Sequence, residues 1–207
     1  MSRKSTLSST TVTNEYLNLV QEQVQDSLSV KQALLQDSDL LSGTVAVSEM
    51  IADALQNHHK LLLFGNGGSA AGAQHIAAEF VGRYRTERRA LPALALTVNT
   101  SSLTAIGNDY GFDVVFSRQI EAFGVSGDVA LGISTSGSSE NIVRALHRAQ
   151  EIGMKTVALT GATGGRLKSR VDYCLAVPSR DTPRVQECHI LLGHIICEIV
   201  ERHLYEE

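Results

Sequence analysis

Two kinds of hydrophobic pattern alternate along the chain from about residue 60 onward. Short, predominantly apolar runs are typical of strands buried on both faces of a parallel sheet, and segments with apolar residues at helical spacing separate them. Strands that alternate with helices form parallel sheets. The pattern therefore predicts a three-layer α/β fold that is built on a doubly wound, five-stranded parallel sheet. The expected strands are Leu61–Phe64, Pro92–Val98, Asp128–Ile133, Lys155–Thr160 and Tyr173–Val177.

The polar residues between the strands indicate where helices and turns lie. We expect a turn at Asn108–Gly111 and a short helical turn at Arg166–Ser169. A short helix is expected at Leu103–Gly107, and the longer expected helices are Ala70–Tyr84, Val114–Phe123, Asn141–Ile152 and Arg184–Leu204.

Two further helices are expected before the first strand, between Asn14 and His58, with a polar break at Gln36–Asp39. Each has an apolar stripe that it cannot bury alone, so the pair must cover the sheet or pack against another subunit. Met1–Thr13 is rich in Ser and Thr, and we expect it to be flexible. Residues 14–207 then form a single domain that includes the N-terminal helical extension.

Composition narrows the functional classes. At 207 residues and 43% hydrophobic content, the chain is long enough for one domain with a substantial core. The net charge is −4 and no basic block occurs, which argues against a nucleic-acid partner. No apolar run approaches the roughly 20 residues that a membrane span requires.

Three cysteines, Cys174, Cys188 and Cys197, lie in apolar contexts without a CxxC pair. An odd number of apolar cysteines indicates free thiols in a reducing compartment. The polar N-terminus has no apolar segment of the kind found in a secretory signal. These observations predict a cytoplasmic protein.

A glycine-rich turn, Gly65–Ser69, joins the first strand to the following helix. Glycines let the backbone turn sharply and approach a ligand, and the free N–H groups at a helix start bind anions. The turn alone is a weak signal, because it is neither GxGxxG nor a P-loop. His75 and Glu79 follow on one face of the helix and could bind a divalent metal, act as acid and base, or form an ordinary surface pair.

A second polar loop, Ser134–Glu140, follows the third strand, and five of its seven residues carry hydroxyl groups. Hydroxyls and free N–H groups at a helix start suit a phosphate monoester, although Ser and Thr also cap helices. Ligands of doubly wound sheets bind at the carboxyl ends of the strands, where both loops lie. One pocket could therefore be lined by Asn66–Ser69 and Ser134–Ser139.

The final helix carries Gln186 and His194, which are eight residues apart and can share a face. His189 on the same helix is expected to be solvated or satisfied within the core.

Together these motifs resemble the sugar isomerase (SIS) fold, which is flavodoxin- or Rossmann-like, and within it the phosphoheptose isomerases. The resemblance extends from about Leu61 to His194. Its motifs are GNGGS (Gly65–Ser69), HIAAEFVGRY (His75–Tyr84), AIGNDYGF (Ala105–Phe112), GISTSGSSENI (Gly132–Ile142), ALTG (Ala158–Gly161) and RVQECHILLGH (Arg184–His194).

The resemblance implies a role for each matching residue. His75, Glu79, Gln186 and His194 match the ligands of one Zn2+ per subunit, and Glu79 and His194 also match the catalytic base and acid. The residues that match substrate and phosphate contacts are Asn66, Gly67, Gly68, Ser69, Glu79, Arg83, Asn108, Asp109, Ser134, Thr135, Ser136, Ser139 and Gln186. Pro183 departs from an Asp found in some members, which puts one peripheral substrate contact in doubt.

The implied reaction is the aldose–ketose isomerisation of sedoheptulose 7-phosphate to D-glycero-D-manno-heptose 7-phosphate through an enediol. Its product would supply ADP- or GDP-heptose for surface glycans such as lipopolysaccharide. The implied assembly is a homotetramer with sites at subunit interfaces, which would cover the N-terminal helices.

Two alternatives remain at this point. SAAGAQH (Ser69–His75) and LTAI (Leu103–Ile106) resemble a DiaA-like adaptor that binds the replication initiator DnaA and lacks the metal set. The filled Glu79 and His194 positions favour the isomerase. A sugar-phosphate-binding regulator would keep the hydroxyl-rich loop and need no metal.

Overall fold

The computed structural model describes residues 9–205 and contains the predicted five-stranded sheet. All strand pairs are parallel, and the strand order is β2-β1-β3-β4-β5. The order reverses direction between β1 and β3, so a crevice can open at the carboxyl ends of these two strands. The strands are β1 Leu61–Gly65, β2 Ala93–Ala95, β3 Val129–Ser134, β4 Lys155–Thr160 and β5 Tyr173–Ala176.

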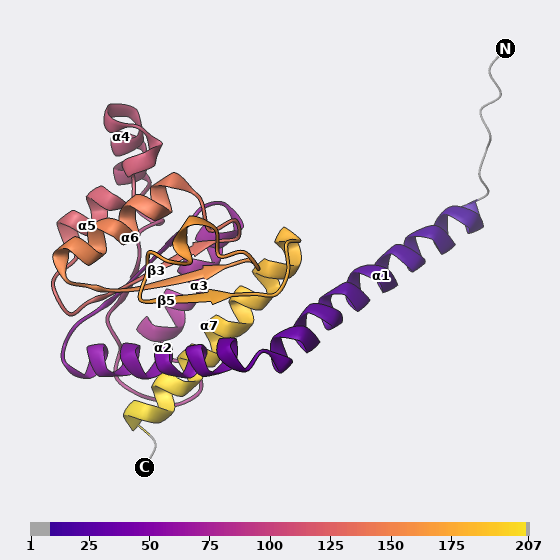
Figure 1. The fold of residues 1–207 in the computed structure, drawn as a ribbon, viewed down its shortest axis with the longest axis horizontal. Coiled ribbons are helices and arrows are strands. Elements are labelled where there is room, and N and C mark those ends of the chain that lie inside the picture. Colours follow the sequence, from indigo (N-terminus) through magenta and orange to yellow (C-terminus); the bar gives the residue numbers. More distant parts are fainter. Residues whose placement is uncertain (1–8, 206–207) are drawn as a thin grey trace.

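Helices cover both faces of the sheet, as the three-layer prediction requires (Figure 1). Along β1, Leu61 and Leu63 pack with α2 (Ser38–Gln56), α3 (Gly68–Val81) and α7 (Thr182–Tyr205) on one face. Leu62 and Phe64 pack on the other face with α5 (Ser117–Phe123) and α6 (Glu140–Ile152). The alternation follows from the two-residue period of a strand, and it confirms the predicted fold class.

The N-terminal extension consists of α1 (Ser9–Gln36) and α2, separated by Asp37 at the predicted polar break. The Asp37 carboxylate accepts a hydrogen bond from the Leu40 N–H and so caps the start of α2. Figure 1 shows α1 projecting far from the sheet. Helix α1 begins before the predicted Asn14. The remaining part of the expected flexible N-terminus, residues 1–8, lies outside the described residues.

The segment after β2 differs from the prediction. Helix α4 spans Thr100–Tyr110, so the turn expected at Asn108–Gly111 was wrong: its first three residues form the last turn of this helix. Asn99 caps the helix start by accepting from the Ser102 N–H, and Gly111 ends the helix with φ +90°. Gly107 inside the helix suggested an earlier end, but a helix tolerates an isolated glycine at a cost of about 1 kcal/mol.

Strand β2 is also shorter than the expected Pro92–Val98, because only three of its residues pair with β1. Short 3-10 turns, η1 (Phe112–Val114) and η2 (Gly165–Leu167), complete the described elements. Among residues 9–205, no helix is long and apolar enough to cross a membrane.

Candidate active site

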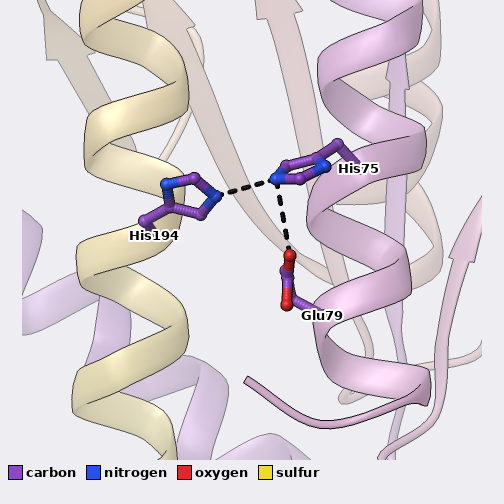
Figure 2. Close-up of side chains that lie close together, drawn as sticks. All are labelled: His75, Glu79 and His194. Atoms are coloured by element: carbon purple, nitrogen blue, oxygen red, sulfur yellow. Dashed lines mark hydrogen bonds and ion pairs between the residues drawn. The ribbon is translucent and has the colours of Figure 1, made fainter. Parts of the chain in front are cut away.

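Two imidazoles and a carboxylate converge between α3 and α7 (Figure 2). The His75 Nε2 lies 2.8 Å from the His194 Nε2, and 3.4 Å from the Glu79 Oε1. His75 and Glu79 are one helical turn apart on α3, whereas His194 reaches them from the neighbouring helix. All three side chains are accessible to solvent, since none of the three residues is buried.

The donor set fits a divalent metal. Zinc bonds of about 2.1 Å in a tetrahedral site place neighbouring donor atoms about 3.4 Å apart. The His75–Glu79 separation matches that edge, and the imidazole pair would need to open by about 0.6 Å from its 2.8 Å separation. His75, Glu79 and His194 form the group of three potential ligands found among the described residues, each within 4.8 Å of the others.

Gln186, the fourth predicted ligand, lines the same cavity as His75. This cavity of about 410 Å³ lies between the amino-terminal parts of α3 and α7, and its walls include Ile76, Ile133 and Ile190. A Cβ at Gly68 would lie only 2.8 Å from the Gln186 Nε2, so the glycine lets the amide approach the start of α3. The cavity extends from His75 and Gln186 to Gly68 and Ser69 of the glycine-rich turn.

The glycine-rich turn is shaped by close backbone contacts. A Cβ at Gly65 would lie 2.8 Å from the Ser69 backbone, and Gly67 has φ +54°, which favours glycine. Asn66 and Asn141 form a reciprocal pair of amide hydrogen bonds of 2.9 Å. The turn after β1 is therefore fixed against the start of α6, beside the second polar loop.

The hydroxyl-rich loop gathers its side chains toward one another. Ser134 Oγ lies 3.1 Å from Ser139 Oγ and 3.4 Å from Ser136 Oγ. Ser139 occupies the N-cap position of α6 without making a side-chain capping bond. Thr135 holds the loop through its carbonyl, which accepts from the Gly161 N–H. Capping by Ser139 therefore does not explain the hydroxyl groups of this loop, although Ser136 and Ser138 each accept a hydrogen bond from a backbone N–H group.

Glu140 ends the loop at the start of α6, and its carboxylate is paired with two arginines. Hydrogen bonds from Arg166 and Arg144 lower the pKa of the Glu140 carboxyl to about 2. Both arginines are thereby engaged beside the loop, where they offset the negative charge of the carboxylate.

Three predicted substrate contacts lie apart from this cluster. Arg83 is exposed and pairs with Glu87 at 3.6 Å. Asn108 donates to Asp109 on the last turn of α4, a helix with no buried residue that projects from the body of the protein (Figure 1). No contact within the described chain brings these three residues to His75.

Sequence reasoning missed several residues next to the cluster. Tyr84 stacks on the His194 ring, with centroids 5.6 Å apart and an interplanar angle of 24°. Arg88 and Glu201 form a buried ion pair, and Glu201 also accepts a hydrogen bond from the Tyr84 N–H. A sequence signal existed for Glu201: it lies seven residues after His194, on the same face of an apolar helix.

His189 lies in the core rather than in solvent, but only one of its two ring nitrogens has a partner. It is 3% exposed, and its Nε2 lies 3.1 Å from the Thr160 carbonyl oxygen. Because a carbonyl only accepts, Nε2 carries the proton, and Nδ1 has no partner. Burial lowers the pKa of His189 to about 4, although the bond to Thr160 opposes this shift.

Comparison with known proteins places this chain in a family. A family model for the SIS domain matches residues 27–161, which defines the class of protein. The chain is 52% identical to a phosphoheptose isomerase of Clostridium acetobutylicum, over 92% of this chain and 97% of that one. It is 57% identical to a phosphoheptose isomerase of Aquifex aeolicus, over 78% and 85%.

Solved structures agree. The phosphoheptose isomerase GmhA of Neisseria gonorrhoeae superposes with a TM-score of 0.85 at 45% identity, covering 90% of this chain and 98% of that one. The chain belongs to the phosphoheptose isomerases, a family of SIS-domain proteins.

Proposed function

We propose that this protein is an aldose–ketose isomerase that interconverts sedoheptulose 7-phosphate and D-glycero-D-manno-heptose 7-phosphate. The observation that carries the proposal is the convergence of His75, Glu79 and His194 between α3 and α7. Close relatives that carry the name phosphoheptose isomerase support it.

The reaction moves a proton between adjacent carbons through an enediol. It needs a base near both carbons and an acid near the oxygens. We assign Glu79 as the base that takes and returns the carbon-bound proton, and His194 as the acid that serves the sugar oxygens. The position of Glu79, one turn from His75 and with a side chain that is 23% exposed, is consistent with this assignment.

Two groups of binding residues would hold the substrate. The hydroxyls of Ser134, Ser136 and Ser139, with the free N–H groups at the start of α6, suit the phosphate. Asn66 lies near them, because its amide pairs with that of Asn141 at the start of α6. Gly67, Gly68, Ser69 and Thr135 are further proposed contacts, because they match substrate-binding positions of the family. Fixing the phosphate supplies remote binding energy that orients the reacting carbons.

We propose Zn2+ as the metal, held by His75, Glu79, Gln186 and His194. The nitrogen and oxygen donors suit zinc, although other divalent ions also accept such a set. When bound, the ion would act as a Lewis acid toward the sugar oxygens.

We also propose that the protein assembles as a homotetramer. Large apolar side chains are exposed along α1, among them Leu17, Val20, Val24 and Leu28, which are between 55 and 59% exposed. A homotetramer in which these faces pack together would bury them, and α4 of one subunit could then bring Asn108 and Asp109 to a neighbour's site. Residues 14–207 would form the single domain of each subunit.

We further propose a cytoplasmic enzyme, since all three cysteines are unpaired. Its product would enter heptose synthesis for surface glycans such as lipopolysaccharide. The DnaA-binding adaptor is not favoured, because the matching relatives are phosphoheptose isomerases at about half identity.

The test is turnover of sedoheptulose 7-phosphate to its aldose isomer, followed by NMR, in metal-free protein and after adding Zn2+. We expect activity to need the metal. Glu79→Gln should abolish turnover while calorimetry still detects sugar-phosphate binding.

Glu151→Gln is the matched control, because Glu151 is a partly exposed carboxylate that pairs with Arg148 on α6. It should retain wild-type turnover. Normal turnover in Glu79→Gln would refute the base assignment, and no turnover in folded, metal-loaded wild type would refute the proposed function.

A further inference from the structure

A buried carboxylate lies two turns beyond His194 on the same helix. Glu201 is 2% exposed, and seven residues on an α-helix return to the same face after about 10.5 Å. Its oxygens accept from the backbone N–H groups of Tyr84, Arg85 and Thr86 at 2.8–3.0 Å. Helix α7 therefore holds the chain that leaves α3.

Arg88 completes this contact from the other side. Its Nε donates to Glu201 at 2.9 Å, and the Arg88 side chain is only 1% exposed. The remaining guanidinium nitrogens donate to carbonyl oxygens at the end of α3: Nη2 to Glu79 at 2.7 Å and Nη1 to Phe80 at 2.8 Å. These carbonyls belong to the last turn, where a helix has no partners of its own.

The pair thus connects the two helices that carry the candidate metal ligands. Arg88 is bonded to the backbone of Glu79 itself, and Glu201 shares a helix face with His194. Tyr84 adds a third link, because its N–H bonds to Glu201 while its ring stacks on His194. The distances between imidazoles and carboxylate depend on how these two helices are held.

The charges favour a fixed arrangement. Burial opposes ionisation of the Glu201 carboxyl, but the three backbone N–H groups and Arg88 outweigh it and lower its pKa. The Glu201 carboxyl is therefore ionised at neutral pH, and the planar guanidinium of Arg88 donates to it in a fixed direction. A buried pair of this kind often adds little net stability compared with apolar residues, so its specific geometry calls for another explanation.

We propose that Arg88 and Glu201 are positioning residues that set the spacing of His75 and Glu79 on α3 relative to His194 on α7. In the absence of the pair, the end of α3 and the stacked Tyr84 would shift, and the three donors would no longer converge. The inference deepens the proposed function, because it assigns what holds the reacting groups in place.

The test uses Glu201→Gln, which removes the charge and keeps one acceptor oxygen for the backbone N–H groups. We expect the dissociation constant for Zn2+, measured by competition with a chromophoric chelator, to rise about 10- to 100-fold. The kcat for sedoheptulose 7-phosphate should fall by a similar factor, while KM changes less than about threefold because the phosphate loop is untouched.

Asp128→Asn is the matched control. Asp128 is also fully buried and accepts from Lys60 and from the backbone N–H groups of Lys60 and Val125, but it directly precedes β3 and these partners lie outside α3 and α7. It should lower the thermal midpoint without changing zinc affinity or kcat per folded protein. If Glu201→Gln does the same, the pair has a structural role only and the proposal is refuted.

Two further variants keep the test decisive. Glu201→Asp retains the charge, so it should fold if Glu201→Gln does not, but it draws the carboxylate back by one methylene group. Zinc binding should therefore still weaken, and wild-type zinc affinity in Glu201→Asp would overturn the proposal. The double variant Arg88→Met with Glu201→Gln leaves no unpaired charge, so it should regain thermal stability without regaining zinc affinity. If thermal stability and zinc affinity both recover, the pair contributes only to stability and the positioning role is refuted.

The two proposals fail separately. Wild-type protein that binds Zn2+ in a Glu201-dependent way but does not turn over the sugar would refute the function and keep the positioning role. Wild-type turnover that survives Glu201→Gln unchanged would refute the positioning role and keep the function. Protein that neither binds the metal nor turns over the sugar would refute both.

Discussion

Gly193, next to His194, is a point of tight contact between α7 and α3. A Cβ added at Gly193 would lie 2.5 Å from Ile76 Cδ1 and 2.7 Å from Ile76 Cγ1. Carbon atoms in contact are ordinarily about 3.5–4.0 Å apart, so Gly193→Ala forces a displacement of about 1 Å. Ile76 follows His75 directly, so the displacement falls on the candidate metal ligands.

The expected cost can be worked out from these contacts. Adding a methyl group to a packed core typically costs about 1–3 kcal/mol, and replacing a helical glycine by alanine returns about 1 kcal/mol. Gly193→Ala should therefore change the free energy of unfolding by between about 0 and −2 kcal/mol. The larger effect should be on the metal, with zinc binding weakened about tenfold because α3 and α7 separate.

Gly72→Ala is the matched control on α3. Its Cβ would meet Ile190 at 3.8 Å and Ile133 at 4.0 Å, which are ordinary contacts. This variant should gain about 1 kcal/mol from helix propensity, so its thermal midpoint should exceed that of Gly193→Ala by several degrees, at about 2–4 °C per kcal/mol.

A double-mutant cycle with Ile76→Val adds a direct check, because valine lacks the Cδ1 atom that lies closest. We expect a favourable coupling of about 1 kcal/mol between Gly193→Ala and Ile76→Val. Equal stability and equal zinc affinity for Gly193→Ala and Gly72→Ala, with no coupling, would show that the two helices are not in tight contact at this point.

Two further predictions concern the cavity. The pKa of His189 is about 4 in the fold and about 6.5 when unfolded, so the stability from its neutral form is complete above pH 6.5 and is lost as pH falls to 4. The loss should reach about 3 kcal/mol in denaturant titrations, and His189→Gln should remove that part of the pH dependence; an unchanged pH profile would contradict the assignment. Gly68→Ala places a Cβ 2.8 Å from the Gln186 Nε2, so it should weaken zinc binding about tenfold by calorimetry with little change in thermal midpoint. Unchanged zinc affinity would argue against Gln186 as a ligand.

Much of the fold follows from local pattern. The strand Lys155–Thr160 was predicted with its observed bounds, and the break between the first two helices falls at Asp37 as expected. Errors arose where local signals conflict. Gly107 and the Asn108–Gly111 stretch indicated a turn, but the helix that Asn99 caps continues to Tyr110.

Some residues of the candidate site could likewise be predicted from local sequence, and others could not. His75 and Glu79 could be paired from the sequence, because residues four apart on a helix are neighbours. Family motifs pointed to His194, but its place 2.8 Å from His75, across 119 positions of sequence, depends on how α7 packs on α3. Tyr84 gave no signal as a site residue, since its stacking on His194 exists only after packing.

The sequence by itself determined the alternation of strands and helices, the two polar loops at strand ends, and the residue types that suit a metal and a phosphate. These follow from periodicities of two and 3.6 residues and from side-chain chemistry, which are local properties. Tertiary structure decided which donors converge and what holds them. The buried pair of Arg88 and Glu201 connects α3 to α7 over 113 positions, and a contact of that range is set by packing the whole domain.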